Sequence, residues 1–179
     1  PSGKYVAFSV NTTNQNFFSH NENRIEVYDS ASDVVVYDVD NHEITWSPLT
    51  RSKDSFETFP TFSPDGRSLY FCSAKAVSPM PQEYSKAKYS LCRIDFNPED
   101  ASFGEKVDTL YNAAQNGKSV SFPRISPDGK YLIFILQEYG NFSIWHKDAN
   151  LWVVNLSTGD VHPLEAANTE DVESYHSWS

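Results

Sequence analysis

Alternating apolar and polar residues cover most of the chain, and the alternation restarts at a fixed interval. Residues 1–8, 64–71 and 127–134 align without a gap, each beginning Pro-Ser/Asp-Gly-Lys/Arg, and their prolines are 63 residues apart. A repeat of this length indicates one supersecondary unit used several times, so the fold is interpreted through the repeat.

Each copy predicts a β-hairpin. In the second copy the turn reads Ser-Pro-Asp-Gly over residues 63–66. Pro presets φ, Asp bonds nearby backbone, and Gly accepts a positive φ. Apolar residues such as Phe62 and Leu69 flank the turn, as expected of strands. The first copy departs from the pattern, with Ser2 in place of Asp and no inner strand before the turn.

Two further strands follow each hairpin. The third strands are expected at residues 34–38, 90–95 and 151–155, and short fourth strands follow polar turns, as at 44–46 and 161–164. Four antiparallel strands per repeat are typical of a propeller blade. Helical signal is confined to short pieces such as residues 83–88.

We therefore predict an all-β fold: a β-propeller with three four-stranded antiparallel blades plus the first strand of a fourth. The chain is expected to be a partial propeller domain, 1–179, from a ring of six or seven blades. The expected boundaries are 1–50 for blade one, 57–113 for blade two, 120–167 for blade three and 173–179 for the start of the next.

The repeat also carries a family resemblance. Phe-Pro-x-Phe/Ile-Ser-Pro-Asp-Gly-Lys/Arg-x-Leu-x-Phe begins at Phe59 and Phe122, and Leu-Trp-Val-Val-Asn-Leu-x-Thr-Gly begins at Leu151. This pattern resembles the TolB-like propeller repeat and covers the whole chain as repeats. The third copy and the ending Tyr-His-Ser-Trp-Ser look most like periplasmic TolB-like proteins of Bacteroidetes-type bacteria.

Three repeats are fewer than the ~4–8 blades of a closed propeller. The chain starts inside a hairpin turn, so we expect a fragment from which blades are missing. The alternative is that two copies close a six-bladed ring. Open blade edges could mediate self-association, so we expect mass measurement in solution to show monomer or heterogeneous aggregate, whereas a clean dimer would support six-blade closure.

Composition and charge limit the kinds of partner that the chain is expected to bind. The net charge of −10 argues against a nucleic-acid or anionic-membrane surface. No stretch approaches the ~20 apolar residues that span a bilayer. Cys72 and Cys92 fall on neighbouring predicted strands, where two small buried hydrophobic residues are favoured over a cross-strand disulfide.

The motifs that would mark an enzyme are absent from the sequence: no nucleophile elbow, phosphate-cradling loop, paired-Cys metal site or His-Glu-x-x-His occurs. No catalytic residue, metal ligand or cofactor is predicted.

Polar residues on the innermost strands are the first binding candidates. His176 occupies the column of Pro60 and Pro123, with Arg124 one column further on, and the pair could bind an anionic group or a carbonyl; alternatively His176 lines a wet channel. Tyr175 aligns with Phe59 and Phe122, so it is either a channel residue or inter-blade core.

Three long polar insertions supply the other candidates. They span residues 11–32, 76–88 and 138–150 and carry Phe17, Phe18, Tyr28, Tyr84, Tyr139, Phe142 and Trp145. Aromatic side chains on polar loops either form an interface or cap the blade edges. His20 and His146 fall in corresponding insertions, so a shared ligand or metal site is conceivable. Tyr139, Trp145 and His146 are the rim candidates.

The resemblance implies a non-enzymatic interaction module of the bacterial cell envelope, periplasmic or otherwise extracytoplasmic, which binds a protein or an envelope polymer through rim loops and the central channel. TolB-like propellers also occur as the gating domain of prolyl-oligopeptidase-type peptidases and as uronate lyases. The first alternative predicts a Gly-x-Ser-x-Gly elbow in an attached domain. The second predicts a metal-binding His and Gln cluster on inner-strand loops, where only His176 lies here.

Overall fold

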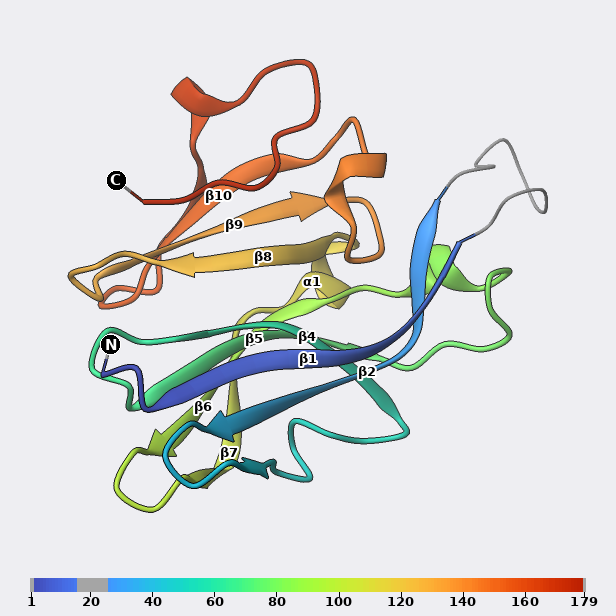
Figure 1. Ribbon diagram of the computed structural model, residues 1–179. Coiled ribbons are helices and arrows are strands. Elements are labelled where there is room, and N and C mark those ends of the chain that lie inside the picture. Colours follow the sequence, from blue (N-terminus) through green and yellow to red (C-terminus); the bar gives the residue numbers. More distant parts are fainter. Residues whose placement is uncertain (1, 16–25, 179) are drawn as a thin grey trace.

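Strand pairing groups the eleven strands of the described residues into three antiparallel sheets (Figure 1). The computed structural model describes residues 2–15 and 26–178. Sheet one has the order β1-β2-β3, from β1 (Tyr5–Gln15), β2 (Val27–Asp38) and β3 (Glu43–Thr45). Sheet two has the order β4-β5-β6-β7, from β4 (Ser55–Phe62), β5 (Ser68–Lys75), β6 (Ser90–Asn97) and β7 (Ser102–Tyr111). Sheet three has the order β11-β10-β9-β8, from β8 (Ser119–Ile125), β9 (Tyr131–Gln137), β10 (Asn150–Asn155) and β11 (Val161–Pro163).

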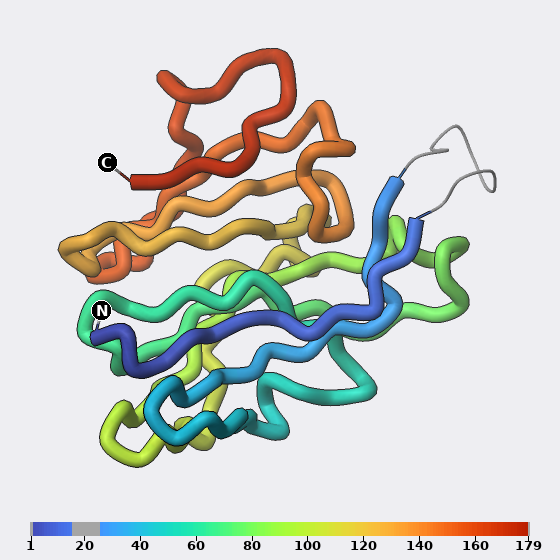
Figure 2. Tube along the Cα trace, in the orientation of Figure 1, coloured from blue at the N-terminus to red at the C-terminus, as the bar shows by residue number. Residues whose placement is uncertain are grey.

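These sheets stack face to face, each meeting the next along the chain (Figure 2). The repeat turns gather at one end of the sheets and the insertions at the other, on the left and right of Figure 1. Helical pieces are short: η1 (Tyr84–Lys86), α1 (Ala113–Asn116), η2 (Ser143–Trp145) and η3 (Glu165–Ala167). The arrangement confirms an all-β partial propeller, and sheet one has three strands because no inner strand pairs with β1 among the described residues.

Hydroxyl groups hold the Ser-Pro-Asp-Gly turns in shape. In the second copy Asp65 Oδ1 accepts hydrogen bonds from Ser63 Oγ at 2.5 Å and from the Arg67 amide at 3.0 Å. Ser63 Oγ in turn accepts from the Ser68 amide at 2.9 Å. The Ser63 hydroxyl is the main cause of a lowered pKa at Asp65, and Gly66 has φ +73°. The third copy repeats these bonds, so the motif closes the hairpin through its side chains.

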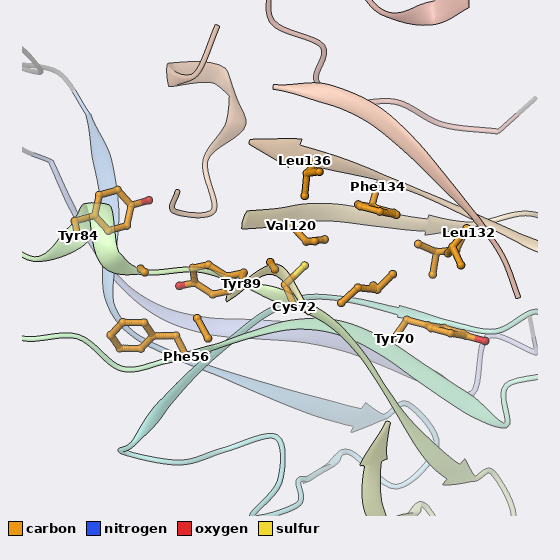
Figure 3. Packing of buried hydrophobic residues seen from close by; sticks show 14 residues of the cluster. Phe56, Tyr70, Cys72, Tyr84, Tyr89, Val120, Leu132, Phe134 and Leu136 are labelled. Atoms are coloured by element: carbon orange, nitrogen blue, oxygen red, sulfur yellow. The ribbon is translucent and has the colours of Figure 1, made fainter. Parts of the chain in front are cut away.

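Two apolar layers hold the sheets together. Val34 and Val36 of β2 pack against Leu69, Phe71 and neighbours of sheet two. The larger layer lies between sheets two and three and contains Tyr70, Cys72, Tyr89, Val120, Leu132 and Phe134 (Figure 3). Burying a side chain such as Leu or Phe contributes about 1.5–3 kcal/mol, so these layers dominate the stability. Both cysteines are free and buried, and they belong to different layers, which confirms the favoured interpretation.

The innermost strands share a feature that the sequence pattern did not predict. Phe59, Phe122 and Tyr175 all adopt positive φ, at 51°, 49° and 55°. At the first two, strand pairing shifts register, between Thr58 and Thr61 and between Ser121 and Arg124. Such a bulge turns one side chain out of the alternation. It directs the rings toward one another: Phe59 stacks on Phe122 at 4.1 Å between centroids, and Phe122 contacts Tyr175 at 5.2 Å. We call these three residues the aromatic column.

The C-terminal segment continues this column without a strand of its own. Residues 174–178 carry no strand assignment, whereas a first strand of a fourth blade was expected there. Tyr175 nevertheless repeats the backbone conformation of its two counterparts. The segment thus lies against β8 through Trp178 and Tyr175, and Tyr175 has a positive φ like its counterparts in β4 and β8.

The insertion predicted for residues 11–32 is wrong at both ends. Antiparallel pairing of β1 with β2 continues to Gln15 and Val27, with one irregularity between Thr12 and Thr13. Polar side chains are compatible with an extended hairpin of this kind because one face of it stays solvated.

Removing the Phe122 ring tests the importance of the column. Phe122 is 9 % exposed and contacts both other rings. We expect Phe122→Ala to lower the free energy of unfolding by about 3–5 kcal/mol, as for other buried Phe→Ala changes, measured by urea denaturation. Tyr175→Ala is the matched control, since it has the same positive φ but is 69 % exposed, and it should cost less than about 1 kcal/mol. Equal losses of unfolding free energy in the two variants would contradict a stabilising role of the buried Phe122 ring.

Candidate binding site

The inner-strand candidates lie together at the end of the aromatic column. The indole Nε1 of Trp178 donates to the Arg124 carbonyl at 2.9 Å, which ties the C-terminal segment to β8. Burial lowers the pKa of His176, and the Arg124 charge contributes, while the carbonyls of Ile133 and Phe122 act in the opposite direction. The His176 ring is therefore neutral at pH 7, and neither buried ring nitrogen makes a hydrogen bond of standard geometry with the described residues.

Two neighbouring side chains reach solvent. Arg124 is exposed, and Tyr175 is 69 % exposed with one part of its ring against Phe122. The interpretation of Tyr175 as inter-blade core does not describe this structure. Arg124 and Tyr175 together offer a cation and an aromatic surface, which can recognise a carboxylate, a carbonyl or a sugar face, while the neutral His176 ring is buried beside them.

The rim candidates are arranged differently, because two of them are committed to internal contacts. His146 is 6 % exposed, its Nε2 lies 3.5 Å from Glu26 Oε1, and its ring meets Tyr139 edge to face at 4.5 Å. The Tyr139 hydroxyl donates to Glu26 Oε2 at 3.3 Å. Trp145 lies in η2 and is half-buried. Tyr139 and His146 thus support the capping interpretation and join the third insertion to the β1–β2 hairpin.

A polar network that sequence reasoning missed joins all three insertions. Asn141 Nδ2 donates to Asp29 Oδ2 at 2.7 Å, and the hydroxyl of Tyr84 donates to Asn141 Oδ1 at 3.0 Å. Asp29 also accepts from Thr13 and Asn11. Burial raises the pKa of Asp29, and these hydrogen bonds oppose the rise. The only sequence signal was that three polar insertions occur at corresponding positions, which gives no pairing partners.

Metal ligation finds no support in the part of the chain that the structure describes, where no three His, Cys, Asp or Glu residues are placed to hold an ion. His20, Phe17 and Phe18 lie outside the described residues, so a site shared by His20 and His146 stays a hypothesis. No helix of the described segments is long and apolar enough to cross a bilayer.

Glu57 is a buried carboxyl group that the sequence pattern does not single out. It lies within β4 and is 1 % exposed. Burial raises its pKa to about 7; hydrogen bonds from Ser55 and Ser73 oppose this, and the charge of Asp33 adds to it. Its Oε2 is buried without a hydrogen-bond partner among the described residues. This carboxyl therefore destabilises the junction of sheets one and two when it ionises.

Comparison with known proteins supports the fold. No family model matches the chain, and no curated protein sequence matches it. A protein from Agrobacterium tumefaciens, described provisionally as TolB, superimposes with a TM-score of 0.53 at 20% identity, over 75% of this chain and 41% of that protein. An oligogalacturonate lyase from Vibrio parahaemolyticus aligns at a TM-score of 0.45 and 12% identity, over 78% and 35% of the two chains. A protein from Bacteroides ovatus, provisionally a dipeptidyl aminopeptidase IV, aligns at 0.32 and 15% identity, over 92% and 32%.

The first superposition defines the class. This chain has the fold of a TolB-like β-propeller, in agreement with the resemblance in its repeats. It spans less than half the length of the structures it matches.

Asn141 provides a test of the polar network. Asn141→Ala leaves the buried Asp29 carboxylate and Tyr84 hydroxyl short of a partner, so we expect a loss of about 1–3 kcal/mol in unfolding free energy, measured by urea denaturation. Asn150→Ala removes a comparable amide that bonds the Asp148 carbonyl in an exposed setting, and it should change stability by no more than about 0.5 kcal/mol. A loss in Asn141→Ala no greater than in Asn150→Ala would show that the network is not stabilising.

Glu57 predicts that stability falls as the pH rises. Because its folded-state pKa is about 7, above the ordinary 4.5, the folded protein binds more protons between these values and loses stability as pH increases through them. Each unit of difference corresponds to about 1.4 kcal/mol. Glu57→Gln should therefore be more stable than the parent above pH 7, by on the order of 2–3 kcal/mol, with the difference vanishing below pH 4.5. Urea titrations from pH 4 to 8 measure this, and a pH-independent difference would refute it.

Proposed function

We propose that this chain is a non-enzymatic interaction module of the bacterial cell envelope, which binds a protein or an envelope polymer. The observation that carries the proposal is the surface at the end of the aromatic column. There the exposed Tyr175 ring and the exposed Arg124 side chain lie beside the neutral His176. Aromatic and arginine side chains are enriched among residues that contribute most to protein interfaces.

Two of the three rim residues expected to contact a partner, Tyr139 and His146, have a structural role instead. Since Tyr139 and His146 are engaged with Glu26, they fix the shape of the insertions instead of contacting a partner. Rim contacts fall to side chains that remain accessible, such as Ile144, which is 51 % exposed, and Trp145 beside it. A rigid rim and an accessible inner-strand surface together form a preorganised binding face, which lowers the entropic cost of association.

An extracytoplasmic location belongs to the same proposal. It is supported by the TolB-like fold and by the family resemblance of the repeats. The net charge of −10 favours partners other than nucleic acids and anionic membranes.

Site-directed crosslinking tests the binding face. A photoreactive phenylalanine analogue at position 175 or 124 should give an adduct of one common mass with an envelope extract, because both side chains face the same partner. The same analogue at Ile44 (51 % exposed, in β3 of sheet one) is the control and should not give that adduct.

Affinity provides the second part of this test. Once the adduct is identified, the purified partner or polymer is titrated against the protein by calorimetry. Arg124→Glu combined with Tyr175→Ala should weaken binding at least tenfold, corresponding to about 1.4 kcal/mol. Adducts of equal yield from all three positions, or unchanged affinity in the double variant, would overturn the proposal.

A further inference from the structure

A cavity of about 470 Å³ lies where sheet one meets sheet two, away from the surface discussed above. Residues 30–33 of β2 form one wall, the connection 46–53 forms another, and the start of β4 forms a third, which leaves the cavity open to solvent on one side. Its volume falls in the range of small-molecule sites, about 300–1,000 Å³.

The connection that lines the cavity is fixed in place. Thr50 is fully buried, its carbonyl accepts from the Val34 amide at 2.8 Å, and its Oγ1 donates to the Val34 carbonyl at 3.0 Å. The Thr50 amide also donates to the Ser47 carbonyl at 3.0 Å. These bonds tie the loop to β2, so the side chains on either side of Thr50 start from a rigid backbone.

Arg51 is oriented by two contacts that leave its outer end unused. Its Nε lies 3.3 Å from Asp33 Oδ2, and its guanidinium lies over the Trp46 ring at 4.7 Å. Within residues 2–15 and 26–178 no partner is found for its two terminal nitrogens. A guanidinium held at Nε and by stacking presents its remaining N–H groups as a planar fork, which matches the two oxygens of a carboxylate.

The other walls complement that fork. Ser32 lines the cavity with its backbone, since it is only 2 % exposed and its hydroxyl interacts with that of the buried Tyr89. Lys53 adds a second positive charge and makes no ion pair with the described residues. Phe56 and Pro48 provide apolar surface.

We propose that this cavity binds a monocarboxylate with an apolar body the size of one ring, the carboxylate on the Arg51 fork with Lys53 adding positive charge, and the body against Trp46 and Phe56. A dianionic phosphate fits less well, since Asp33 and Glu57 lie close by and the chain carries a net charge of −10. The proposal is independent of the partner-binding role, because no residue of the column or of the Arg124 surface lines this cavity.

Three probes of matched size separate the chemistries. 3-Phenylpropionate, its neutral amide and phenyl phosphate are each titrated into ¹⁵N-labelled protein, and amide and indole shifts are followed by NMR. Saturable shifts at residues 31–33, 46 and 51–53 are expected with the carboxylate, and at least tenfold weaker binding with the amide. Equal affinity for the amide, or tighter binding of phenyl phosphate, would overturn the assignment.

Variants of the arginine test the fork directly. Arg51→Gln should weaken 3-phenylpropionate binding at least tenfold, and Arg51→Lys should restore only part of it, because the lysine keeps the charge without the planar donors. Arg67→Gln removes an arginine from a repeat turn and should bind like the parent. Circular dichroism confirms that each variant is folded, and parent-like affinity in folded Arg51→Gln refutes the site.

Discussion

The fold depends most on an uncommon backbone conformation repeated at each inner strand. A non-glycine residue with positive φ is uncommon and costs free energy unless its surroundings compensate. At Phe59 and Phe122 the compensation comes from the rings themselves, which the bulge turns onto one another at 4.1 Å. The contact between Phe59 and Phe122 also positions sheet three against sheet two. The surface with Arg124 and His176 lies where the column ends, at Tyr175. The residues proposed for binding are thus adjacent to the rings that stabilise the fold.

In the insertions a buried polar network adds to the apolar packing of residues such as Tyr84 and Ala87. Asp29, Asn141 and Tyr84 satisfy one another across segments more than fifty residues apart. Buried networks of this kind fix a unique geometry because an unpaired member is costly. The loops are therefore a rigid frame at the sheet ends, and only side chains outside this network, such as Ile144, stay accessible there.

Much of this architecture could be predicted from sequence, for identifiable reasons. The Ser-Pro-Asp-Gly turns and the period of 63 residues determine the hairpins, because each turn residue has a local conformational role. The hairpin extension to Gln15 and Val27 could not be predicted, since polar strands lack the alternation that marks a half-buried sheet. The burial of Glu57 was missed for a similar reason: a carboxylate in an acidic chain is expected to be solvated. His176 and Arg124 were placed together by repeat alignment alone, whereas the partners of His146 and Asn141 depend on contacts between distant loops.

The positions of the two cysteines make their thiols probes of how the sheets separate. Cys72 faces the layer between sheets two and three, and Cys92 faces the layer between sheets one and two. Burial raises the pKa of both thiols, so neither reacts while its seam is closed. Each thiol therefore reports on one interface between sheets. Alkylation of Cys92 records transient separation of sheets one and two, and alkylation of Cys72 records separation of sheets two and three. The chain thereby carries the means to determine, without any added label, in which order a propeller comes apart.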